Sequence, residues 1–172
     1  MSLSKISLPE AGPAFVPPVS IREFQPGDEV CFRRLNEEWI NRYFGIESKD
    51  QEVLLHPQSI ILAHGGRILF ATIGEECVGC CALVRMSADE FEVAKMAVAP
   101  ACQGKGIGRK LLQAVVKTAR SAAARRLYLE TNHILTPAIR LYESIGFRHL
   151  PANCVVPSQY ARADVYMEMI LD

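Results

Sequence analysis

The sequence predicts an α+β fold, a mixed α/β domain built on a mostly antiparallel sheet. Three strand-like segments separated by short turns follow one another between residues 67 and 98. A helical segment then joins the last of them to a further strand, and such a connection makes its two strands parallel. The length of 172 residues suits one domain with a sizeable core.

The N-terminal end differs in composition from the rest of the chain. Residues 1–18 are rich in proline and show no periodic pattern, so we expect a flexible leader there. Residues 19–24 alternate between apolar and polar side chains, which predicts a first strand. The folded domain is therefore expected at residues 19–172.

Helical spacing follows this strand. Apolar residues recur every three or four positions from Val30 to Tyr43, and we expect a helix that ends near Gly45. A second, short helix is expected to begin at Ser48 and to stop before Pro57.

The middle of the chain is rich in strands. Segments 67–73 and 77–86 are separated by a turn that contains glycine, which predicts a hairpin, and segment 91–98 adds a third antiparallel strand. A helix follows, and its apolar residues form one stripe: Ile107, Leu111, Leu112, Val115, Val116 and Ala119.

The last third of the chain continues this alternation of elements. Residues 126–132 predict a strand, and a short helix follows it. Thr136 is expected to cap this helix, with Pro137 in its first turn and Gly146 at its left-handed end. Residues 164–171 alternate and predict a final strand.

Composition argues against several classes of partner. The formal net charge is zero, whereas a protein that binds mainly nucleic acid needs a cationic surplus. No apolar run approaches the roughly 18 residues of a membrane helix, and no signal-peptide pattern is present. We therefore expect a cytoplasmic protein with neither nucleic acid nor membrane as its partner.

The six cysteines are expected to be free thiols. Cys77 and Cys80 have the spacing of a metal or redox pair, but no second pair stands at zinc spacing and the surrounding residues read as a buried strand. The sequence therefore predicts no metal site.

Glycines alternate directly before the long helix, at Gly104, Gly106 and Gly108. Glycine allows backbone N–H groups to approach an anion, and a helix N-terminus directs its unpaired N–H groups and positive dipole end toward that anion. Lys105 and Arg109 add positive charge. The loop fits neither the dinucleotide fingerprint nor the P-loop spacing. We infer a pyrophosphate site, with a plain turn as the alternative.

Two motifs together resemble a known family. Q-G-K-G-I-G at 103–108 follows strand 91–98 and opens an amphipathic helix, and A-I-R-L-Y-E-S-I-G-F follows at 138–147. This combination resembles the GNAT superfamily of acyl-CoA-dependent N-acyltransferases. The likeness extends over about residues 19–172 and is most specific over 91–147. It implies a sheet splayed at its centre, helices on both faces, and acetyl-CoA as acyl donor in the gap.

The resemblance also implies which residues hold the cofactor. The pantetheine arm is expected to pair with the backbone of Met96 and Val98, with Ala97 between them, and Asn132 is expected to contact the cofactor. The pyrophosphate is expected on the loop amides of Gln103, Gly104, Lys105, Gly106, Ile107, Gly108 and Arg109.

Tyr142 is the candidate catalytic acid. In the family a tyrosine at this motif position lies near the cofactor sulfur and can protonate the departing thiolate. The alternative is that Tyr142 only packs, because it belongs to the buried stripe of its helix. Both roles are compatible if the ring is buried and the hydroxyl reaches the gap.

Glu92 is the candidate general base for the acceptor amine. Strict alternation along the strand places it on the same face as Met96 and Val98. Some family members place a glutamate at this distance before the loop. A water chain remains open as an alternative, as do the carboxylates of Glu130, Glu37 and Glu38.

The resulting expectation is an N-acetyltransferase that moves an acetyl group directly to a primary amine in a ternary complex. The acceptor is a small molecule or a peptide, bordered by segments 42–50 and 151–164. Arg42 or Arg162 is a candidate for binding an acceptor carboxylate, with a solvated role as the alternative. A non-catalytic acyl-CoA-binding module is the competing function, and nucleotide binding and cysteine-based transfer are disfavoured. Family members often form dimers, so a homodimer is also open.

Overall fold

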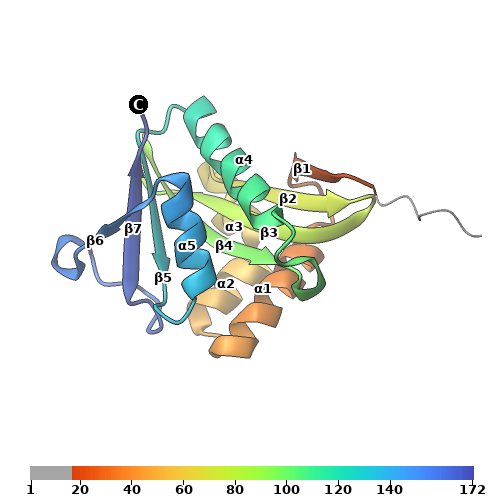
Figure 1. The fold of residues 1–172 in the computed structure, drawn as a ribbon, viewed down its shortest axis with the longest axis horizontal. Helices are drawn as coiled ribbons and strands as arrows, with labels where there is room; N and C mark the ends of the chain where they lie inside the picture. The colour runs from red at the N-terminus through yellow and green to blue at the C-terminus, as the bar shows by residue number, and fades with distance from the viewer. Residues whose placement is uncertain (1–16) are drawn as a thin grey trace, which may run out of the picture.

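The computed structural model describes residues 17–172, so the leader expected at 1–18 lies almost wholly outside the described range. Within that range seven strands form one sheet in the order β1-β2-β3-β4-β5-β7-β6 (Figure 1). Their bounds are β1 (Val19–Glu23), β2 (Arg67–Ile73), β3 (Glu76–Arg85), β4 (Glu90–Val98), β5 (Arg126–Thr131), β6 (Arg148–Leu150) and β7 (Val165–Ile170). The sequence located these strands except β6, which is too short to show alternation.

The sheet is mixed, as expected. Strands β4 and β5 run parallel, and the other neighbouring pairs between residues 17 and 172 run antiparallel. The parallel pair is the one joined by the long helical crossover.

Five helices are described in residues 17–172, together with three short 3-10 turns. The helices are α1 (Glu29–Tyr43), α2 (Ser48–Leu55), α3 (Pro57–Ile60), α4 (Ile107–Ser121) and α5 (Thr136–Ile145). The 3-10 turns cover Leu62–His64, Pro100–Cys102 and Ala152–Cys154.

Two details of the helices differ from expectation. Pro57 does not only end a helix: it opens α3, because proline fits the first turn, where no N–H is needed. Thr136 does not cap α5, because Leu135 occupies the cap position and no side chain makes a capping hydrogen bond there. Gly146 ends α5 with φ of 119°, the left-handed conformation expected of it.

Helices cover both faces of the sheet, with α4 and α5 on one side and α1, α2 and α3 on the other (Figure 1). Each side has its own core. Leu112 of α4 packs with Val93 of β4 on the first side, and Phe32 of α1 packs with Phe70 of β2 on the second. The whole apolar stripe predicted for α4 is buried.

The sheet is splayed at its centre. Strands β4 and β5 pair only where Glu90–Glu92 lies beside Arg126–Tyr128. Beyond that point β4 continues to Val98 without β5 beside it, so the described strands diverge and leave a gap.

Candidate active site

A cavity of about 480 Å³ occupies the gap between the splayed strands. Its walls come from the second half of β4, the glycine loop, the end of β5 and helix α5. Lys105 is exposed and does not line the cavity. The other sequence-predicted site residues do line it, namely Glu92, Met96, Ala97, Val98, Gln103, Gly104, Gly106, Ile107, Gly108, Arg109, Asn132 and Tyr142.

The glycine loop presents a run of unpaired N–H groups. Gly104 and Gly106 have positive φ, 74° and 77°, and Gly106 is the N-cap of α4. The first helical hydrogen bond of α4 runs from the Lys110 amide to the Gly106 carbonyl, at 3.1 Å. The amides from Gly104 to Arg109 donate no hydrogen bond to any group in residues 17–172. This loop therefore has the geometry of an anion site at a helix N-terminus.

Gln103 and Gly108 hold the glycine loop in position. The Gln103 amide already donates to the Pro100 carbonyl at 3.3 Å, so the free amides begin one residue later than expected. Its side chain donates to the Val98 carbonyl at 3.0 Å. Gly108 has a packing role, because a Cβ there would lie 3.2 Å from Leu141 Cδ2.

Strand β4 contains a bulge at the cavity. Lys95 has φ of 50°, a rare value for a residue other than glycine. The pairing with β3 shifts there, because Ala97 faces Cys80 whereas Ala94 faces Ala82. Strand β4 therefore holds one residue more than β3 over this stretch, and the extra residue reverses the alternation of its side chains.

This bulge corrects the face predicted for Glu92. Met96 packs with Val93 against the core beneath α4 and α5. Glu92 instead faces Val84 across the sheet, and Val84 packs on the α1 side. Glu92 therefore lies on the face opposite to Met96, toward α1 and α2, and the expectation of a shared face is wrong.

Two of the candidate bases meet at the cavity. Glu92 on β4 and Glu130 on β5 both line it. Burial, followed by the charge of Glu130, raises the pKa of Glu92 to about 7, against the opposing effect of Lys95 and Lys49. A carboxyl with this pKa is well placed to exchange a proton near neutral pH.

The carboxylate of Glu130 is held in place by hydroxyl groups. It accepts hydrogen bonds from Tyr128, at 3.1 Å, and from Ser158. The alternatives Glu37 and Glu38 do not line the cavity, and Glu37 instead pairs with Arg33 on the surface of α1.

Tyr142 combines packing with access to the cavity. Its side chain is 8% exposed, and its ring meets Phe147 edge-on with centroids 5.9 Å apart. Its hydroxyl makes no hydrogen bond within residues 17–172, although the residue lines the cavity. Burial, with a smaller effect of Cys81, raises the pKa of Tyr142 above its ordinary value, so the hydroxyl keeps its proton at neutral pH.

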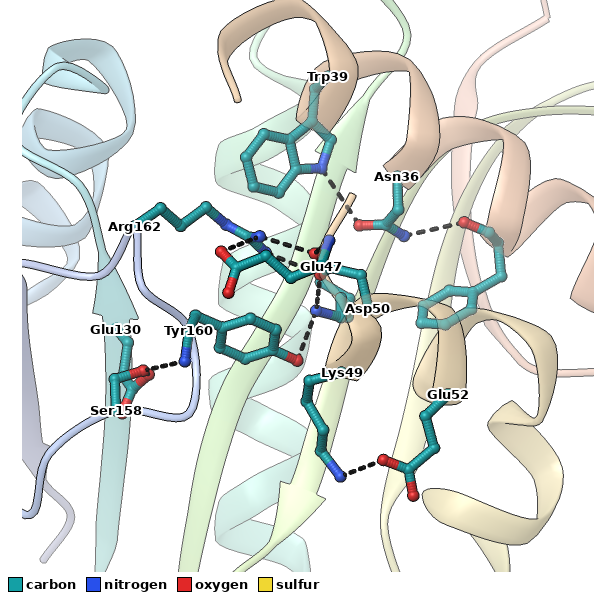
Figure 2. Close-up of polar contacts among 12 residues, drawn as sticks. Asn36, Trp39, Glu47, Lys49, Asp50, Glu52, Glu130, Ser158, Tyr160 and Arg162 are labelled. Carbon is teal, nitrogen blue, oxygen red and sulfur yellow. Dashed lines mark hydrogen bonds and ion pairs between the residues drawn. The ribbon is translucent and has the colours of Figure 1, made fainter. Parts of the chain in front are cut away.

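A cluster of buried ion pairs contributes Lys95, Tyr160 and Arg162 to the cavity wall. Figure 2 shows how Glu47, Asp50, Tyr160 and Arg162 lie in this cluster. Lys95 Nζ donates to Asp50 Oδ1 and to the Tyr160 hydroxyl, both at 2.8 Å. Arg162 donates to both oxygens of Asp50 at 2.7 Å and to Glu47 at 3.0 Å. We call these five residues the ion cluster. It joins the bulge of β4, helix α2 and the loop before β7.

Asp50 is the centre of the ion cluster. Its side chain is fully buried. Burial alone would raise the pKa of Asp50, but the hydrogen bonds from Arg162 and Lys95 outweigh it and lower that pKa to about 2. Asp50 is therefore ionised at neutral pH and pairs with both cations, and Glu47 supplies the second negative charge.

The sequence did not single out Lys95, Asp50 or Tyr160. The available signal was a lysine inside the otherwise apolar end of β4. Segments 42–50 and 151–164 both contribute residues to the cavity wall, and Arg162 is 13% exposed and tied into the ion cluster rather than solvated.

Asn132, Cys80 and Cys81 are occupied by structural roles. Asn132 donates to the Arg162 carbonyl at 2.6 Å and accepts from the Ile134 amide at 3.0 Å, so its amide group already organises the loop. The Cys80 and Cys81 thiols are buried, and burial raises the pKa of each well above its ordinary value. Neither thiol is therefore a ready nucleophile.

Two absences hold for residues 17–172. No group of three His, Cys, Asp or Glu side chains is arranged to hold a metal ion in this range. In the same range, no helix has both the length and the apolar character that crossing a bilayer requires.

Comparison with known proteins identifies the family. An uncharacterised N-acetyltransferase of Escherichia coli, YjgM, is 40% identical over 72 residues, 42% of this chain and 43% of that one. The IAA acetyltransferase of Azospirillum brasilense is 31% identical over 134 residues, 77% of this chain and 86% of that one. This chain matches between 21% and 43% of the length of four curated relatives, YjgM included.

Solved structures agree on the fold. A GNAT-family acetyltransferase of Staphylococcus aureus superposes with a TM-score of 0.82 at 21% identity, covering 90% of this chain and all of that one. The yncA protein of Salmonella typhimurium, solved with its cofactor acetyl-CoA, superposes with a TM-score of 0.70 at 21% identity. The superposition covers 90% of this chain and 95% of that one. Residues 32–147 match the sequence profile of the acetyltransferase (GNAT) family. The chain belongs to that family.

Proposed function

We propose that the protein transfers an acetyl group from acetyl-CoA to the primary amine of a small-molecule or peptide acceptor, directly and within a ternary complex. The observation that carries the proposal is the run of free amides from Gly104 to Arg109, which opens onto the same cavity as Tyr142 and Glu92. Family membership supports acetyl-CoA as the donor.

The cofactor half of the cavity suits coenzyme A. The loop amides and the positive end of α4 would hold the diphosphate. The free edge of β4 around Met96 and Val98 would pair with the amides of the pantetheine arm as a further strand would. Both sets of contacts use backbone groups, which are already in position.

The chemistry then needs three groups. Glu92, on the acceptor side of β4, takes a proton from the ammonium so that the free amine can attack the thioester carbonyl carbon. The Met96 N–H polarises the carbonyl oxygen. The C–S bond breaks as the C–N bond forms, and Tyr142 gives its proton to the departing thiolate. Most of the acceleration comes from holding donor and acceptor side by side.

The first test separates an enzyme from a binding module. Thermal shift with acetyl-CoA, CoA, ATP and NAD identifies the ligand, because a ligand that binds the folded state raises Tm. Release of free thiol from acetyl-CoA, followed across a panel of amines, then measures transfer. A large shift with acetyl-CoA without thiol release would favour the non-catalytic acyl-CoA-binding module.

The second test addresses Tyr142. We expect Tyr142→Phe to lower kcat by about 100-fold, because a positioned acid contributes at least that much, while acetyl-CoA affinity measured by calorimetry stays the same. Tyr43→Phe is the matched control, because Tyr43 also lines the cavity but is half exposed. An unchanged rate in Tyr142→Phe would remove the acid role.

A further inference from the structure

The acceptor half of the cavity has an uneven balance of charge. Its charged lining residues are Glu92 and Glu130, on β4 and β5, and Lys95 and Arg162 of the ion cluster. Which of these charges an incoming acceptor meets depends on which are already compensated inside the protein.

Both cations are already compensated. Lys95 is paired with Asp50, and Arg162 is paired with Asp50 and Glu47. The Lys95 side chain is 5% exposed. The four charges of these residues sum to zero, and Figure 2 shows the three labelled members of this set, Glu47, Asp50 and Arg162, drawn together around Tyr160.

Aromatic rings enclose the Arg162 guanidinium further. Its central carbon lies 4.6 Å from the ring centroid of Tyr160 and 5.9 Å from those of Trp39 and Phe44. The same three rings line the cavity, so an acceptor meets aromatic walls around a cation whose charge is already balanced.

A remaining cation, Arg109, is at the other end of the cavity. It belongs to the glycine loop and donates to the Ser144 hydroxyl at 2.9 Å. Lys95, Arg162 and Arg109 are the cations among the described residues that line the cavity. The proposed diphosphate would lie beside Arg109, which leaves no uncompensated cation for a carboxylate on the acceptor.

The two carboxylates are not compensated in this way. Glu130 accepts hydrogen bonds from neutral hydroxyls, which leave its negative charge in place. Glu92 faces it across the splay and makes no hydrogen bond or ion pair within residues 17–172. An ammonium group entering between them meets the negative charge of Glu130 and stabilises the ionised form of Glu92, whereas a carboxylate there meets like charge.

We propose that the acceptor is a small primary amine with an apolar or aromatic body and no carboxylate beside the amine, and that free α-amino acids are rejected. This inference rests on the proposed acetyl transfer. The ammonium is recognised between Glu92 and Glu130, and the body of the molecule packs on the rings of Trp39, Phe44 and Tyr160.

Matched pairs of amines test the proposal. Thiol release from acetyl-CoA is measured with tyramine, tyrosine and tyrosinamide, and with tryptamine and tryptophan. We expect kcat/KM for each amine to exceed that of its amino acid by at least about tenfold, because like charges placed together are strongly disfavoured. Tyrosinamide has the branched shape of tyrosine without the negative charge, so we expect it to rank with tyramine.

The outcomes separate this inference from the proposed function. Equal or faster transfer to tyrosine than to tyramine would overturn the inference and leave acetyl transfer intact. Slow transfer to both tyrosine and tyrosinamide would assign the rejection to size and would also overturn it. Thiol release with none of the amines, despite bound acetyl-CoA, would overturn the proposed function and this inference with it.

A pair of variants tests the electrostatic cause. Glu130→Gln is expected to lower the tyramine-to-tyrosine ratio of kcat/KM at least threefold while leaving the KM for acetyl-CoA unchanged. Glu37→Gln is the control, because this carboxylate lies outside the cavity on the surface of α1. Equal ratios in both variants would show that Glu130 does not contribute to the selection.

Discussion

The two ends of the cavity are built in different ways. The end that we propose for the cofactor is made of backbone: unpaired amides of one short loop and the free edge of one strand. The acceptor end is made of side chains from α1 and the residue that follows it, from β4 and β5, and from the loop before β7. The first kind of site can be encoded by one local motif, whereas the second exists only once distant segments have come together.

The energetic cost of the two ends also differs. The amides at the start of α4 are unpaired in any helix, so an anion site there needs little beyond loop geometry. The ion cluster instead takes four charged groups out of water, which is costly even when every charge is paired. We infer that its value lies in geometry, because it holds α2 and the loop before β7 at fixed positions around the acceptor.

The largest expected effect tests this dependence on buried charge. Asp50→Asn leaves Lys95 and Arg162 without their shared buried partner, and we expect a loss of about 3–5 kcal/mol in the free energy of unfolding. Urea denaturation measures it. Glu52→Gln on the same helix removes the exposed ion pair with Lys49 and is expected to cost at most about 1 kcal/mol. Similar losses in both variants would mean that the ion cluster contributes no more than a surface pair.

The next effect probes the cofactor end. Gly108→Val adds a side chain where even a Cβ lies 3.2 Å from Leu141 Cδ2 and 3.5 Å from Met96 Cε. We expect a loss of about 1–3 kcal/mol in stability from overpacking, together with weaker acetyl-CoA binding as the start of α4 shifts.

A matched glycine provides the control. Gly45 has nothing within 4 Å of an added Cβ and no positive φ, so Gly45→Val is expected to change stability and acetyl-CoA affinity far less. Calorimetric titration with acetyl-CoA compares the two. Unchanged affinity in Gly108→Val would show that packing at this position does not influence acetyl-CoA binding.

The same contrast explains what could be predicted from sequence. The apolar stripe of α4, the position of the glycine loop at the start of that helix and the antiparallel hairpins are local patterns, and the structure bears them out. The ion cluster is not local: Asp50 and Arg162 are 112 positions apart, and Lys95 and Tyr160 are 65 apart. No spacing rule connects such residues before the fold is known.

The bulge in β4 is the clearest miss. A period of two assigns faces correctly only while a strand stays in register with its neighbour. One extra residue at Lys95 moved Glu92 to the opposite face from Met96, and the residue with positive φ is a lysine rather than the glycine or asparagine that would have indicated a bulge. The candidate base was therefore identified, but its side of the sheet was not.

The smallest effect concerns that base. The folded-state pKa of Glu92 is raised to about 7, mainly by burial and then by Glu130, with Lys95 and Lys49 opposing. In the unfolded chain a glutamate titrates near pH ~4.3. Between these values the folded protein holds a proton that the unfolded chain has released. The wild type therefore loses stability as the pH rises through this window.

Glu92→Gln removes this titration. Relative to the wild type, we expect the unfolding free energy of the variant to rise by about 1–2 kcal/mol between pH 5 and pH 8. This gain is smaller than the full pKa shift would give, because Glu92 is only partly buried. Its kcat should also lose the limb that rises through about pH 7 in the wild type, since glutamine cannot accept the proton of the amine. Urea denaturation at both pH values and a pH–rate profile measure the two effects. A stability gain without the loss of that limb would mean that Glu92 is a strained buried acid and that another group or a water chain accepts the proton.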